Sequence, residues 1–323
     1  MAEETHKMGI KIYAGYRVQQ GDFHMPFGLF FYNNSVQKQF PQFRCLTRDG
    51  RPIEALSFAF PEVRKIAINS IIKTLSKEWD GVSIFFRRGV VVSLEQPVID
   101  EVEKRYGVDA RRLPRSDERL HSVLCEFVTS FMRELKAALN KKAQEENRAN
   151  YEINIITFHD VKSSKYFGYD VEAFLKEGLV NSVSQGIMMY YEDIDDCLAS
   201  DGLIDIEKYK QKKSKQFVIK RWFDDDGDHI IGGVKEYLEL QKKYGGEFYA
   251  ALGWENKDYP YQLELAKAIY EAGAEKMISW NGNHQAKYCS KLWGIKACGD
   301  KELIEKGGAS ITSKSFRLTS LMV

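Results

Sequence analysis

Six apolar runs, each ending in aromatic, charged or amide residues, limit the folds open to this chain more than any other feature. They lie at residues 10–17, 80–88, 151–160, 179–189, 248–255 and 276–283. Helical patterns fill most of the gaps; the clearest repeats apolar residues every three or four positions from Leu120 to Leu135. Buried parallel strands read as continuous apolar runs, and strand–helix alternation builds parallel sheets. We therefore predict an α/β fold, a (β/α)₈ TIM-type barrel, with its active site just past the C-terminal strand ends.

Composition excludes several other classes of protein. The chain has 323 residues and a formal net charge of +1, so it lacks the global field that attracts nucleic acid or anionic membranes. No apolar stretch approaches the ~20 residues that span a bilayer, and the polar N-terminus does not read as a signal peptide. The five cysteines are scattered, which argues against disulfide frameworks and zinc ribbons. We predict a single domain over 1–323 with no metal, no cofactor and no nucleic-acid or membrane partner.

Four stretches of the sequence resemble a known family. They are residues 79–89, which begin Trp79-Asp80-Gly81; residues 94–114, with Leu94-Glu95-Gln96-Pro97; residues 170–180; and residues 270–281, which end in Trp280-Asn281. Together they resemble the glycosyl-hydrolase-like barrel proteins often labelled "family 10 glycosylhydrolase" in bacterial genomes. The resemblance implies that strand 10–17 is the third of eight. The first two strands are then missing, so the barrel is incomplete, with strands three to eight present. Alternatively, part of the loop at 18–60 supplies extra strand. On the first interpretation the chain is a fragment of a longer gene or an incomplete gene model, which leaves localisation open.

Three acidic residues near strand ends are the candidate catalytic groups. Glycoside hydrolysis generally needs two carboxyl groups flanking the bond, one of them with a raised pKa. Glu95 follows the second strand and matches an acidic position of the family, and Glu255 ends the fifth visible strand. We predict Glu95 as acid/base and Glu255 as nucleophile or base, with Asp160 in reserve. The alternatives are a carboxylate placed at a helix N-terminus for Glu95 and a solvated loop acid for Glu255.

Other residues at the strand ends are candidate substrate ligands. Arginines there suit anionic sugars, or else form ion pairs with the site acids. Aromatic faces stack on sugar rings, and amides or acids bind sugar hydroxyls. The predicted substrate-binding set is Arg17, Phe86, Arg87, Arg88, His159, Tyr190, Tyr191, Glu192, Trp254, Trp280, Asn281 and Asn283.

The sequence thus predicts a glycoside hydrolase that cleaves a poly- or oligosaccharide with paired carboxylates. A non-catalytic carbohydrate-binding barrel is the alternative, and carboxyl groups far more than ~10 Å apart would favour it. A barrel enzyme acting on a phosphorylated metabolite would need a Gly-rich phosphate cradle, of which Asn281-Gly282-Asn283 is a poor version. The sugar, the linkage and the oligomeric state are not specified by these patterns.

Overall fold

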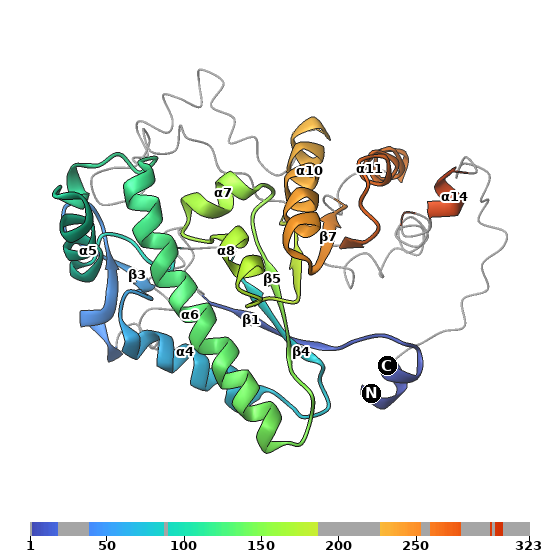
Figure 1. Cartoon of the computed structure of the whole chain (residues 1–323), viewed down its shortest axis with the longest axis horizontal. Coiled ribbons are helices and arrows are strands. Elements are labelled where there is room, and N and C mark those ends of the chain that lie inside the picture. Colours follow the sequence, from blue (N-terminus) through green and yellow to red (C-terminus); the bar gives the residue numbers. More distant parts are fainter. Residues whose placement is uncertain are drawn as a thin grey trace.

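A six-stranded parallel sheet organises the part of the chain that the structure describes (Figure 1). The structure is a computed structural model, and it describes residues 2–18, 39–86, 90–186, 227–252, 259–278, 298 and 301–305. The strands, in chain order, are β1 (Tyr13–Arg17), β4 (Gly81–Phe85), β5 (Glu152–Ile156), β6 (Ser182–Ser184), β7 (Glu247–Ala251) and β8 (Met277–Ile278).

Strand order in this sheet follows chain order, and every neighbouring pair is parallel. The α/β class with a parallel sheet is therefore confirmed. Sequential parallel order is the arrangement of a β/α barrel. No pairing between β8 and β1 occurs among the described residues, so closure into a barrel stays a prediction.

The helices begin and end where local sequence signals place them. Pro61 opens α4 (Pro61–Thr74) in the first turn, and Asp117 caps α6 (Glu118–Glu145). Gly107, in the left-handed region at φ 67°, ends α5 (Gln96–Tyr106). The other helices are α1 (Ala2–Lys7), α7 (Val161–Tyr166), α8 (Val171–Lys176), α10 (Gly227–Tyr244), α11 (Tyr259–Glu271) and α14 (Lys301–Glu305).

Segment 18–60, predicted as one long loop, contains regular structure in its described part. An antiparallel hairpin pairs β2 (Arg44–Leu46) with β3 (Pro52–Leu56), after a short 3₁₀ turn at Pro41–Phe43. The hairpin lies outside the parallel sheet, so it adds no strand to it. Ser57, just after β3, donates its backbone N–H to the carbonyl of Phe43 at 2.8 Å.

The apolar core lies between the helices and one face of the sheet. Alternate strand residues point into it, such as Val82, Ile84, Ile153 and Ile155, all fully buried. Helix α6 runs beside α4 (Figure 1) and presents its apolar stripe to this core. The sheet is therefore covered on this face by amphipathic helices, as parallel sheets require.

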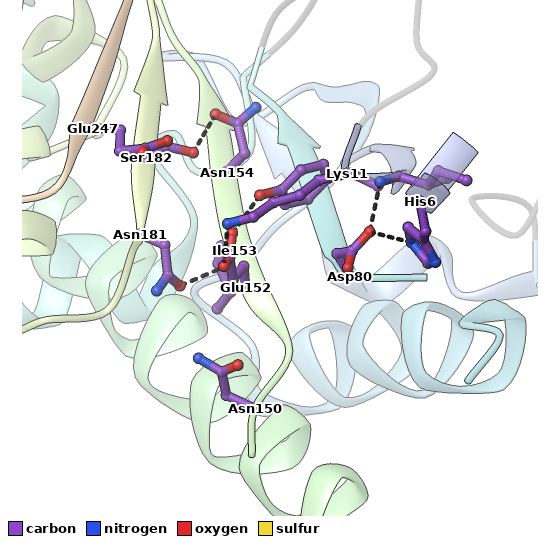
Figure 2. A network of polar contacts seen from close by, with 12 residues as sticks. His6, Lys11, Asp80, Asn150, Glu152, Ile153, Asn154, Asn181, Ser182 and Glu247 are labelled. Carbon is purple, nitrogen blue, oxygen red and sulfur yellow. Dashed lines mark hydrogen bonds and ion pairs between the residues drawn. The ribbon is translucent and has the colours of Figure 1, made fainter. Parts of the chain in front are cut away.

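The opposite face of the sheet carries a row of small polar side chains. Asn154 donates to the Ser83 hydroxyl at 2.7 Å and accepts from the hydroxyls of Ser182 at 2.9 Å and Ser184 at 3.0 Å. Figure 2 shows Asn154 and Ser182 side by side on β5 and β6. One buried amide therefore joins β4, β5 and β6 through their side chains as well as their backbones.

Two glutamates begin strands β5 and β7 at the N-terminal end of this face, and each contacts a lysine and a tyrosine. Glu152 binds Lys11 at 2.6 Å and the Tyr13 hydroxyl, while Glu247 binds Lys276 at 2.5 Å and the Tyr249 hydroxyl at 2.7 Å. Figure 2 shows Lys11 and Glu152 beside the ion pair between His6 and Asp80. The acids at this end of the sheet are thus paired.

Burial and two nearby acids raise the pKa of a tyrosine on this face. Burial is the main cause of the raised pKa of Tyr13, and the charges of Glu152 and Glu247 add to it.

Removing the amide of the polar row should cost stability. Asn154→Ala leaves the hydroxyls of Ser83, Ser182 and Ser184 without their shared partner in a buried layer. We expect a loss of about 2–4 kcal/mol in the free energy of unfolding, measured by urea denaturation. Asn150→Ala, at an exposed position just before β5, is the control and should change it by less than about 0.5 kcal/mol. Equal effects of the two variants would contradict the role of Asn154.

Candidate functional site

The segment after β5 brings a histidine and an aspartate together at the C-terminal edge of the sheet. His159 Nε2 lies 2.7 Å from Asp160 Oδ2, with the two side chains 5% and 19% exposed. Asp160 also caps α7 by accepting the backbone N–H of Ser163. Although burial opposes it, the bonds from His159 and Ser163 hold the pKa of Asp160 below its usual value. Asp160 is therefore an ionised carboxylate at neutral pH.

The backbone beneath this pair is fixed by buried side chains. Gln185 Nε2 donates to the carbonyl of His159 at 2.8 Å, and the Tyr237 hydroxyl donates to the carbonyl of Phe158 at 3.0 Å. The same tyrosine oxygen lies 2.9 Å from the hydroxyls of Thr157 and Ser164. Such a satisfied network holds a site rigidly, because each polar group depends on its neighbours.

Two glycines allow the chain to pack this closely. A Cβ at Gly233 on α10 would lie 2.0 Å from the His159 carbonyl oxygen and 3.0 Å from Gln185 Nε2. A Cβ at Gly186, just after β6, would lie 1.8 Å from the carbonyl oxygen of Thr157. Helix α10 and the end of β6 can thus approach segment 157–160 only without side chains at these positions.

A second acid near Asp160 was missed by the sequence analysis. Glu236 lies on the exposed side of α10 and accepts the backbone N–H of Val161 at 3.0 Å. Partial burial and the neighbouring charge of Asp160 raise its pKa. Because it sits within a helix and not at a strand end, no motif or spacing marks Glu236 in the sequence.

Glu95, predicted as the acid/base, is fully buried at 0% exposure. Its two carboxylate oxygens accept the backbone N–H of Ser93 at 3.1 and 2.9 Å, and Cys45 and Ser57 also hydrogen-bond to it. Burial raises its pKa against these bonds, which lower it. The carboxylate ties the β2–β3 hairpin to the start of α5, so these contacts favour a structural role. Its catalytic role stays a prediction.

Two predicted substrate ligands lie in different settings. Arg17 is exposed at the end of β1, in register with Phe85. Phe86 is 1% exposed and stacks on Tyr169 with ring centroids 4.4 Å apart, which favours a role in the core; its assignment as a substrate ligand stays a prediction. It continues the alternation of Val82 and Ile84 and therefore points into the core.

The remaining predicted residues lie outside the described part of the chain. They are Arg87, Arg88, Tyr190, Tyr191, Glu192, Trp254, Glu255, Trp280, Asn281 and Asn283. The structure therefore brings together His159 and Asp160 from the predicted set, and it leaves the convergence of the others untested.

Other features of the described residues lie away from this edge. A groove of about 950 Å³ opens at the N-terminal end of the strands, between α1 and the turns that carry Asp80 and Arg148. The described residues contain no group of three or more His, Cys, Asp or Glu side chains placed to hold a metal ion. None of the described helices has the length and apolar character to cross a lipid bilayer.

Comparison with solved structures gives a likeness in fold. The glycoside hydrolase domain of PgaB (BpsB) from Bordetella bronchiseptica superposes with a TM-score of 0.51, over 89% of this chain and 75% of that domain. The two sequences are 12% identical, so the likeness concerns the fold alone. No protein-family model and no curated protein sequence matches this chain. The resemblance to the "family 10" proteins therefore stays a prediction.

The close approach of α10 gives a direct test of the site's framework. Gly233→Ala should push α10 away from His159 and Gln185, lowering the free energy of unfolding by more than about 2 kcal/mol. Gly232→Ala is the matched control, because a Cβ there meets nothing within 4 Å. It should be neutral or gain about 0.5–1 kcal/mol from helix propensity. Urea denaturation measures both, and similar behaviour of the two variants would contradict this packing.

The raised pKa of Glu95 predicts a dependence of stability on pH. The folded state holds this proton more tightly than the unfolded state, so the group's contribution is full below its usual pKa near 4.5. That contribution is lost as the pH rises through the raised value. Glu95→Gln lacks this titrating carboxyl group. The difference in Tm, wild type minus variant, should therefore decrease as the pH is raised from 4 to 8. The difference for Glu103→Gln, exposed on the same helix, should stay flat; a flat difference for Glu95→Gln would refute the buried carboxylate.

Proposed function

We propose that this protein acts on carbohydrate, hydrolysing a glycosidic bond in a poly- or oligosaccharide at the C-terminal edge of the sheet. The observation that carries the proposal is the ionised Asp160, held by His159 just past the end of β5 in a parallel sheet. The fold likeness to a glycoside hydrolase domain supports the substrate class. In β/α barrels, residues just past these strand ends perform the chemistry.

The proposed catalytic pair is Asp160 and Glu255. Asp160 follows β5, and Glu255 comes four residues after Ala251, the last residue of β7. One strand, β6, separates these two ends, so their strand axes stand about 10 Å apart. That spacing suits two carboxyl groups on either side of a glycosidic bond. Asp160, with its lowered pKa, would serve as base or nucleophile, the role predicted from the sequence for Glu255, and Glu255 would then serve as the acid.

A non-catalytic carbohydrate-binding protein is the second candidate. The observation in its favour is Glu95, the predicted acid, whose buried carboxylate has its hydrogen-bond partners within the protein, at Ser93, Cys45 and Ser57. A binding protein needs only the hydroxyl and stacking contacts of the edge, without a proton donor for the leaving group.

Hydrolysis of a polysaccharide panel distinguishes the two candidates. Release of reducing ends should occur with at least one polysaccharide, and Asp160→Asn should lower the rate 100-fold or more. Asp170→Asn is the matched control, because Asp170 caps α8 as Asp160 caps α7, and its rate should stay within about twofold. Retention measured by affinity electrophoresis without release of reducing ends would favour the binding protein. If no polysaccharide of the panel is retained or hydrolysed, both candidate functions are refuted.

A further inference from the structure

One nitrogen of a buried imidazole has no partner at the C-terminal edge of the sheet. His159 is 4% exposed, and its Nδ1 atom is buried without a hydrogen-bond partner among the described residues. The other ring nitrogen, Nε2, contacts the carboxylate of Asp160. Buried polar atoms nearly always have partners, so an unmet nitrogen in a fixed ring calls for an explanation.

The surroundings hold the backbone of His159 in place. Its carbonyl is held by Gln185, and Gly233 packs directly against it. The carbonyl of Phe158 is held by Tyr237 at 3.0 Å. A buried acceptor without a hydrogen-bond partner lowers the stability of the folded state. This acceptor lies just past the C-terminal end of β5, and β/α barrel proteins bind their ligands at such strand ends.

The partner of Nε2 decides what Nδ1 can bind. An ionised carboxylate only accepts hydrogen bonds, so Nε2 must carry the proton that Asp160 receives. In the neutral imidazole Nδ1 then carries a lone pair, which can accept a hydrogen bond. The ring therefore offers an acceptor to a ligand, and a hydroxyl group is the donor that carbohydrates supply in number.

We propose that His159 Nδ1 accepts a hydrogen bond from a ligand hydroxyl, and that Asp160 is the positioning residue that fixes the required tautomer. The identification of the ligand as a carbohydrate rests on the proposed function; the hydroxyl-accepting state of the ring does not. A site of this kind discriminates strongly against an analogue that lacks the hydroxyl, because the buried nitrogen is then left unpaired.

His121 provides an internal control in the same chain. It is also buried, at 6% exposure, but its Nε2 contacts the carbonyl of Arg115 at 2.6 Å and its Nδ1 lies 3.8 Å from Glu118. Its Nε2 is thus engaged by the protein and a carboxylate lies near its Nδ1, so His121 serves as the reference imidazole.

The test is nitrogen NMR of the full chain labelled with ¹⁵N-histidine, with His159→Phe used to assign the signals. Without ligand, His159 should show a protonated Nε2 and an unprotonated Nδ1, and Asp160→Asn should populate the other tautomer. A protonated Nδ1 in the wild type would overturn the proposal, as would an unchanged tautomer in Asp160→Asn.

Titration then identifies what the nitrogen accepts. Neutral cello-, malto-, xylo- and chito-oligosaccharides, and glycerol as a small polyol, should shift Nδ1 of His159 but not the nitrogens of His121. If glycerol shifts the Nδ1 signal and none of the oligosaccharides does, the hydroxyl-binding site is supported and the carbohydrate function is rejected. No shift with any probe, or an unchanged Nδ1 while an oligosaccharide binds by calorimetry, would overturn the site. For an oligosaccharide that binds, His159→Phe should weaken affinity at least tenfold.

Discussion

The buried amide of Gln185 is the interaction on which the C-terminal edge of this sheet depends. Its oxygen accepts the backbone N–H of Ala251 at 2.9 Å, and its nitrogen donates to the carbonyls of His159 at 2.8 Å and Ile230 at 3.2 Å. One side chain just after β6 thus joins the end of β7, helix α10 and the loop after β5. An amide buried at 0% exposure tolerates no loss of these partners, so it fixes their relative positions.

The two ends of the sheet differ in how their charges are balanced. At the N-terminal end Glu152 and Glu247 each contact a lysine and a tyrosine. At the C-terminal end Asp160 contacts an imidazole whose other nitrogen has no partner in the described residues. The first arrangement is complete within the protein, as expected for the stabilising end of a parallel sheet. The second lacks one partner, which makes it the end suited to a ligand.

Local signals predicted much of the fold, and tertiary contacts account for what they missed. Caps such as Asp117 and Gly107 act within one turn, so the sequence alone locates helix ends. The β2–β3 hairpin was missed because β2 has three residues among aromatic side chains that read as a loop. The burial of Glu95 depends on Cys45 from that hairpin and could not be predicted without it. The burial of Phe86, by contrast, follows from the two-residue alternation that begins at Val82 and is visible in the sequence.

The state of Asp160 sets what chemistry this edge could perform. One of its oxygens accepts from Ser163 and the other from His159, and these bonds keep its pKa low. It can therefore take a proton or carry charge, but it cannot donate a proton to a leaving group near neutral pH. Glu95 has the raised pKa of a proton donor, but its carboxyl group is buried. Glu236 also has a raised pKa and is exposed, on helix α10 outside the sheet. The hydrolase that we propose takes its acid from a segment that follows another strand end, the position that Glu255 holds in the sequence.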